Sequence, residues 1–153
     1  MDAFYAKLQP VAHASLRLAA GCAYFSHGAQ KFLGWFGGFG ADGGTADLMS
    51  RFGAAGVIET FAGALLIVGL FTRPVAFVAS GQMAVTYFWM HWARSGEMWW
   101  WENRGEVVLL YAFIWLLFSA IGAGPFSIDA WRRKARETRE RGDTGGAAFR
   151  GGG

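Results

Sequence analysis

Residues 54–71 read AAGVIETFAGALLIVGLF, a stretch in which Glu59 is the only charged residue. A helix of about 20 apolar residues crosses the hydrocarbon core of a bilayer. Three further stretches have similar length and composition: roughly 11–33, 74–92 (PVAFVASGQMAVTYFWMHW) and 106–123 (EVVLLYAFIWLLFSAIGA). The last two, like 54–71, lack the polar stripe that a surface helix of a small soluble bundle needs. The sequence therefore predicts an all-α, membrane-embedded four-helix bundle.

The composition agrees with this class and excludes others. Hydrophobic residues make up 54% of the 153 residues and charged residues 16%, against about 25% charged in an average soluble domain. This apolar content excludes intrinsic disorder, and a single cysteine, Cys22, excludes a disulfide scaffold. Sustained period-two alternation is missing from the sequence, which argues against strands. We expect a membrane domain over residues 1–131 and a basic, mostly disordered tail over residues 132–153.

Lysine and arginine residues predict the orientation. An even number of spans puts both termini on one side, which carries nine Lys and Arg residues against three or four on the other. The positive-inside rule then places both termini in the cytoplasm, in a plasma (inner) membrane of the bacterial type. From Trp131 on, seven basic residues face three acidic ones, a net charge of +4. Such a tail fits an anionic lipid surface, so we expect the bilayer rather than a nucleic acid as its partner.

Ionisable side chains inside the apolar stretches are the main functional signal, because charged groups in a bilayer are costly. Counted at about 1.5 Å per helical residue, five of them reach one layer near the outer face: His27, Lys31, Glu59, His91 and Glu106. Arg17 lies roughly 15 Å or more toward the cytoplasm. Small residues at helical spacing around these positions predict that the layer faces the packed interior.

The residues leave two interpretations of this layer open. It is either a structural cluster that locks the helices or a site that binds a ligand or exchanges protons. A metal is not expected, because no strong ligand spacing such as H-E-x-x-H occurs. The tryptophans of the outer loop, among them Trp100, either form an interfacial belt or line a pocket for a flat or apolar ligand.

Motifs in all four stretches, over roughly residues 17–129, together resemble the DoxX family of small four-span membrane proteins. The first and second stretches carry R-x-x-x-G with HG-x-x-K, and E-x-x-x-G with GL-x-TR. The fourth opens with N-x-G-E and is followed by GxGxxSxD. The third carries a methionine and a histidine in the expected order. The matching residues are Arg17, Gly21, His27, Gly28, Lys31, Glu59, Gly63, Gly69, Thr72, Arg73, Met83, His91, Asn103, Gly105, Glu106, Gly122, Gly124, Pro125, Ser127 and Asp129.

The resemblance implies a redox-linked role. Some relatives are similar to the membrane subunit of a thiosulfate:quinone oxidoreductase, and others are associated with membrane complexes that handle thiol or oxidative stress. The first hypothesis is thus a membrane subunit, not catalytic alone, that binds a quinone or another apolar ligand. A redox protein or small reductant would supply the electrons, because no electron carrier is encoded by motif. The alternative is a non-enzymatic scaffold, or a conduit for protons or small solutes. The oligomeric state stays open, with a homo-oligomer among the possibilities.

Overall fold

A computed structural model describes residues 2–150, with side chains through Arg141, and its regular structure is helical, which confirms the all-α prediction. Across these residues there is no strand, only an isolated β-bridge between Phe39 and Gly44. The long helices are α1 (Asp2–Leu33), α2 (Arg51–Val68), α3 (Thr72–Thr86), α6 (Glu106–Ile121) and α7 (Ile128–Arg150). A π-helix, η1 (Tyr87–Trp92), continues α3, and α4 (Ala93–Ser95) and α5 (Trp100–Asn103) are short.

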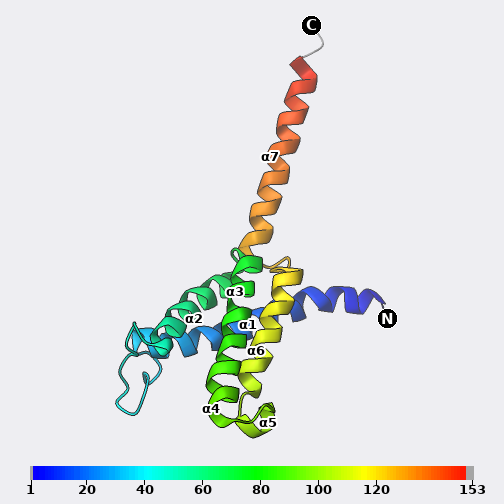
Figure 1. Cartoon of the computed structure of the whole chain (residues 1–153). Helices are drawn as coiled ribbons and strands as arrows, with labels where there is room; N and C mark the ends of the chain where they lie inside the picture. The colour runs from blue at the N-terminus through cyan, green and yellow to red at the C-terminus, as the bar shows by residue number, and fades with distance from the viewer. Residues whose placement is uncertain (1, 151–153) are drawn as a thin grey trace.

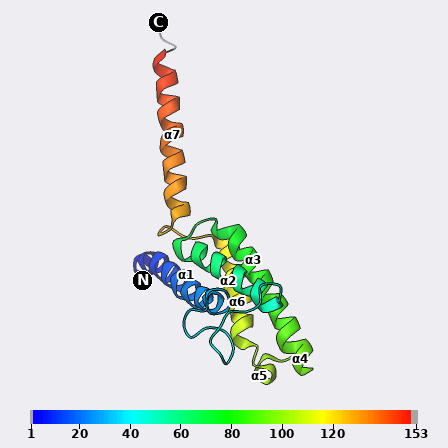
Figure 2. The same cartoon turned by 90° about the vertical axis from the view of Figure 1, so that its left-hand side faces the viewer.

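The helices pack as two antiparallel pairs. Helix α1 packs mainly on α2, and α3 packs mainly on α6. The pairs cross steeply, so that α1 runs across α3 and α6 rather than beside them (Figures 1 and 2). Helices α4 and α5 lie at one end of α3 and α6, and α7 leaves from the other, which we call the α7 end. The glycine-rich loop of residues 34–50 lies at the end of the α1–α2 pair.

Glycines bring α1 and α2 into close contact. A Cβ atom on Gly56 would lie 2.7 Å from Lys31 Cβ, and one on Gly63 would lie 2.8 Å from Phe25 Cα. Residues with side chains would force the two backbones apart at both points. The glycines of the sequence pattern therefore lie on the packed face, as predicted.

The core lies where the two pairs cross. Tyr24 of α1, Leu66 of α2, and Trp115 and Phe118 of α6 are at most 1% exposed. Alanines of α3 and α6 fill the space around these large side chains. The core therefore combines large side chains with small ones, which lets the side chains of facing helices interdigitate.

The α7 end is fastened by two charged side chains. Arg17, 2% exposed, donates from Nη1 to the Leu66 and Ile67 carbonyls at 2.6 and 2.5 Å, and from Nη2 to the Phe126 carbonyl at 2.6 Å. A guanidinium suits the end of α2, because the last carbonyls of a helix have no partners within it and carry partial negative charge. Arg17 thus ties α1 to the end of α2 and to the segment before α7.

Asp129 closes the same end from α7. Its Oδ1 and Oδ2 accept from the main-chain N–H groups of Phe71 and Thr72, each at 2.9 Å, so it caps the start of α3. Burial acts to raise the pKa of this carboxyl, but the two N–H donors, together with the Thr72 side chain and the positive charge of Arg132, hold the pKa below its ordinary value. The motifs around residues 69–73 and 122–129 therefore contact each other and together hold the α7 end in place.

The helices differ in whether they are long and apolar enough to cross a membrane. Within residues 2–150, α2 is the one helix that is both long and apolar enough to cross a membrane by itself. Helix α6 is apolar but has 16 residues, and α3 has 15 before it continues into η1. Four membrane spans remain a prediction.

The tail differs from its prediction. Helix α7 runs through Arg150 and projects from the α7 end (Figure 1), where we expected mostly disorder. Residues 131–141 favour a helix, because arginine, lysine, glutamate and alanine rank among the best helix formers. Residues 151–153 of the predicted tail lie outside the described range.

Candidate functional site

An ion pair between α1 and α2 is the centre of the polar site. Lys31 Nζ lies 2.5 Å from Glu59 Oε2, and the Glu59 side chain is 2% exposed against 20% for Lys31. Gly56, one turn before Glu59, admits the Lys31 side chain at this height. A carboxylate so deeply buried needs a countercharge, and Lys31 supplies it.

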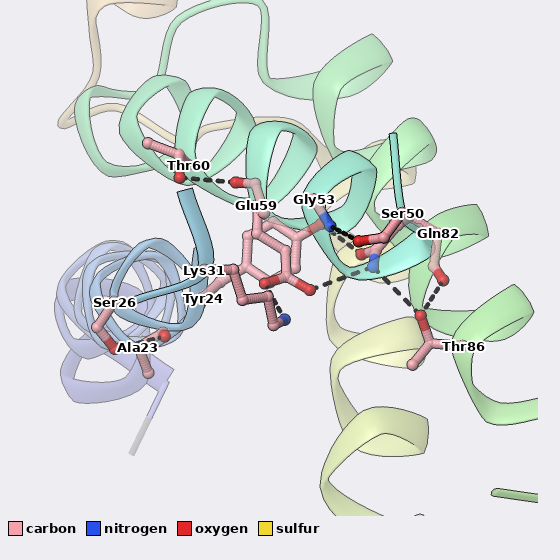
Figure 3. Close-up of polar contacts among 11 residues, drawn as sticks. Ala23, Tyr24, Ser26, Lys31, Ser50, Gly53, Glu59, Thr60, Gln82 and Thr86 are labelled. Carbon is pink, nitrogen blue, oxygen red and sulfur yellow. Dashed lines mark hydrogen bonds and ion pairs between the residues drawn. The ribbon is translucent and has the colours of Figure 1, made fainter. Parts of the chain in front are cut away.

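Uncharged side chains extend the ion pair to α3. Gln82 donates from Nε2 to Glu59 Oε1 at 3.2 Å and accepts from the Tyr24 hydroxyl through Oε1 at 2.8 Å. The Gln82 amide also lies 3.2 Å from Thr86 Oγ1. Figure 3 shows these side chains converging between the helices. Both Glu59 oxygens therefore have partners, and the network joins α1, α2 and α3.

This network borders a groove between α2 and the α3–η1 helix. The groove has a volume of about 670 Å³. Its polar lining includes Lys31, Glu59, Gln82, Thr86 and His91, and its walls are mainly apolar, among them Ile58, Val78, Val85, Trp89 and Met90. Arg51 and Arg94 lie at its rim, with the Arg51 guanidinium 5.0 Å from the Trp89 ring centre. An apolar groove with a few polar groups is the usual form of a small-molecule site.

His91 enters the groove from the π-helix. Its Nδ1 lies 3.0 Å from the main-chain oxygen of Asn103. A carbonyl oxygen only accepts, so Nδ1 carries the hydrogen, and in the neutral ring Nε2 is the acceptor. A π-helix adds a residue to the turn and often occurs at functional sites, and η1 sets the direction of His91 here.

Asn103 organises the loop that holds His91. Its buried amide donates to the Glu97 carbonyl at 2.9 Å, and its Oδ1 accepts from Gly105 N at 2.8 Å. A Cβ on Gly105 would lie 2.6 Å from both Asn103 Oδ1 and the Tyr87 ring. The N-x-G part of the motif therefore has a structural explanation: it shapes the loop against η1.

The structure does not bring the other candidates to the groove. His27 is exposed and has no hydrogen bond, ion pair or ring contact with any described residue. Glu106 is exposed in the first turn of α6, where a negative charge favours the positive end of the helix dipole. Trp100 is 39% exposed and packs with Trp99 and Trp101 outside the groove. Of the five predicted side chains, three share the site.

The sequence reasoning overlooked part of the site. Tyr24, Gln82 and Thr86 are uncharged, so a search for buried charge does not find them. Trp89, rather than Trp100, is the tryptophan of the groove. No group of three or more His, Cys, Asp or Glu residues that could hold a metal occurs in the described part of the chain.

The arrangement offers specific chemistry. Lys31 has N–H groups beyond the one that pairs with Glu59, and the neutral form of the His91 ring has a basic nitrogen, on a surface with apolar walls. Such a set can bind a ligand with an apolar body and carbonyl or hydroxyl oxygens, and can exchange a proton with it through His91.

Comparison with known proteins identifies the family. The DoxX family matches residues 12–92. An uncharacterized protein of Haemophilus influenzae is 40% identical over 125 residues, which cover 80% of this chain and 92% of that protein. No solved structure shows a significant match. The chain therefore belongs to the DoxX family of membrane proteins.

Proposed function

We propose that the protein is a four-span membrane subunit whose groove binds a quinone or a similar apolar ligand in a redox-linked process. The observation that carries the proposal is the meeting of Lys31, Glu59, Gln82 and His91 at one apolar groove. The donors and the basic nitrogen match the oxygens of a quinone head, and the walls match its apolar body.

The proposed spans are α1, α2, the continuous α3–η1–α4 segment and α6. Helix α1 has 32 residues, or about 48 Å, so it is long enough to cross a bilayer with a strong tilt. The α7 end, with Arg73 and the basic tail, would face the cytoplasm of a bacterial-type cell together with the N-terminus. The groove would then open toward the outer half of the membrane.

Each side chain has a proposed task. Lys31 would donate hydrogen bonds to the ligand oxygens, and His91 Nε2 would take or return a proton. Gln82, whose two amide hydrogens go to Glu59 and Thr86, would hold Glu59 in place from α3. Glu59 would hold Lys31 in place. A quinone takes up two electrons and two protons when it is reduced, and a redox protein partner or small reductant would exchange the electrons. His27 and Glu106, which lie away from the groove, drop out of this proposal.

The test compares matched variants in purified protein. His91→Ala should lower the quinone that co-purifies with the protein, at equal protein yield and melting temperature, because it removes the groove's basic ring. His27→Ala is the control, since its ring lies on an exposed face. Equal quinone content in wild type and His91→Ala, or equal loss in both variants, would rule the proposal out.

A second candidate, a non-enzymatic membrane scaffold, has one observation in its favour. Both oxygens of Glu59 are satisfied within the protein, as a purely structural cluster requires. This function predicts that Glu59→Gln lowers stability or partner binding with no change in any bound ligand. A conduit is less well supported: Tyr24, which lies between Arg17 and Lys31 on α1, packs in the apolar core with Leu66 and Trp115.

A further inference from the structure

A surface at the α7 end combines cationic and apolar groups. Arg73, at the start of α3, and Arg133, in the first turns of α7, line one hollow of about 470 Å³. Arg132 lies beside them, with its guanidinium 4.9 Å from the centre of the Phe71 ring. We propose that this hollow binds the phosphate head group of an anionic phospholipid in the cytoplasmic leaflet.

The charges of the hollow favour an anion. Arg73 and Arg133 face one carboxylate there, that of Asp129. Both oxygens of Asp129 already accept main-chain N–H groups at the start of α3, which offset its negative charge. Among the described residues, neither Arg73 nor Arg133 forms an ion pair with a carboxylate within 4.0 Å. Guanidinium groups bind phosphate oxygens through paired hydrogen bonds.

A neighbouring hollow serves as an internal comparison. It follows α7 for two further turns and has a volume of about 500 Å³. Its lining holds three arginines and three carboxylates: Arg132, Arg133, Arg136, Asp129, Glu137 and Glu140. Its formal charges cancel, so the site belongs in the first hollow, beside Arg73.

Exposed apolar groups supply the second half of a lipid site. Phe71 is 52% exposed, Phe126 61% and Trp131 70%. Phe71 lines the hollow, Phe126 lies in the chain between the lining residues Pro125 and Ser127, and Trp131 lies two residues before Arg133. Ile121, Pro74 and Pro125 add apolar lining. A phosphate at the arginines would place acyl chains along these side chains, at the depth where aromatic residues concentrate in membrane proteins.

This inference shares only the membrane embedding and orientation with the proposed function and does not depend on the quinone. A failure of the quinone test leaves it intact. The orientation is tested separately with Glu137→Cys in a Cys22→Ser background, by measuring how accessible this single thiol is in intact cells and in inverted vesicles.

The experiment measures lipid retained by the full-length protein. Protein in nanodiscs of mixed phosphatidylglycerol and phosphatidylcholine is extracted and analysed by native mass spectrometry. Wild type should retain phosphatidylglycerol in preference to phosphatidylcholine. Arg73→Gln with Arg133→Gln should lower this preference roughly tenfold or more, because each basic residue at a membrane surface contributes on this scale. The corresponding lysine double variant should keep much of it.

The matched control is Arg139→Gln with Arg141→Gln, which removes the same charge further along α7. It should retain most of the preference, because in this structure α7 carries these residues away from the bundle (Figure 1). Equal loss in both double variants would overturn the site, since it would show a general effect of tail charge. Displacement of the lipid by millimolar inorganic phosphate would also overturn it, in favour of a free-phosphate site.

Discussion

Gly28 of α1 lies against the main chain of Thr60 in α2, so closely that a Cβ on residue 28 would be 2.3 Å from Thr60 N. Real contacts of a Cβ atom are never this short, and the obstacle is backbone rather than a flexible side chain. Glu59 immediately precedes this contact. The position of the buried carboxylate is therefore set by a glycine on the neighbouring helix.

Gly28→Ala should destabilise the protein. An added methyl group must push α1 and α2 apart, and overpacking of this kind costs about 1–3 kcal/mol. The measurement is thermal unfolding of the detergent-purified protein. Gly81→Ala is the control, since a Cβ there meets nothing within 4 Å and alanine favours a helix. A melting temperature for Gly28→Ala equal to that of wild type would show that the helices are further apart than described.

Lys31 and Glu59 should be strongly coupled. Lys31→Met leaves a buried carboxylate unpaired, and loss of one partner of a buried pair costs about 3–5 kcal/mol. The double variant with Glu59→Gln should recover much of this loss, because it removes the charge. A double-mutant cycle on unfolding free energies measures the coupling. Additive effects of the two substitutions would contradict a direct ion pair.

Arg17→Met should loosen the α7 end. Three carbonyl oxygens lose their donor, and hydrogen bonds to a charged group contribute about 1.5–3 kcal/mol each. We expect a total loss of about 3 kcal/mol or more, with partial recovery in Arg17→Lys, whose ammonium cannot reproduce the planar fork. Unfolding free energies measure this, with the exposed Arg94→Met as control. Equal effects at both positions would exclude the described anchoring.

Asp129→Ala should destabilise the protein at neutral pH but not in acid. The pKa of Asp129 is lowered in the folded protein, so its contribution is complete above the unfolded pKa of about 3.9 and is lost as the pH falls through the folded pKa. A capping carboxylate contributes about 1 kcal/mol. Melting temperatures of wild type and variant should therefore converge below about pH 4. Asp42→Ala, in an exposed loop, should show no such convergence. A difference that persists in acid would assign the loss to packing.

The sequence predicts the position of a buried side chain along its helix better than the side of the helix on which it lies. Counting residues along each helix placed Lys31, Glu59 and His91 in one layer, and the structure brings these three to one groove. The same count included His27, which lies four residues before Lys31 on the same helix. The helix is rotated so that Lys31 reaches Glu59, and His27 is left on an exposed face.

Local geometry explains the remaining differences. The π-helix Tyr87–Trp92 breaks the regular helical period, so extrapolation along α3 cannot give the direction of His91. Glu106 has a local explanation at the start of α6, which an argument based on span depth ignores. Gln82 links Tyr24 to Glu59 through two hydrogen bonds, yet an argument based on charge gives it no weight.

The crossing of the two helix pairs has a mechanical consequence. Gly56 and Gly63 hold α1 and α2 in backbone contact, while the groove follows the thinner contact between α2 and α3. The contact between α2 and α3 is smaller than the contacts within each pair, so a change in the width of the groove would come from a shift along this contact. A small rotation of one pair against the other would change the width of the groove while every helix stays intact. Lys31 and Glu59 would move with one pair, and Gln82 and His91 with the other, so such a rotation would also change the distance between donor and base.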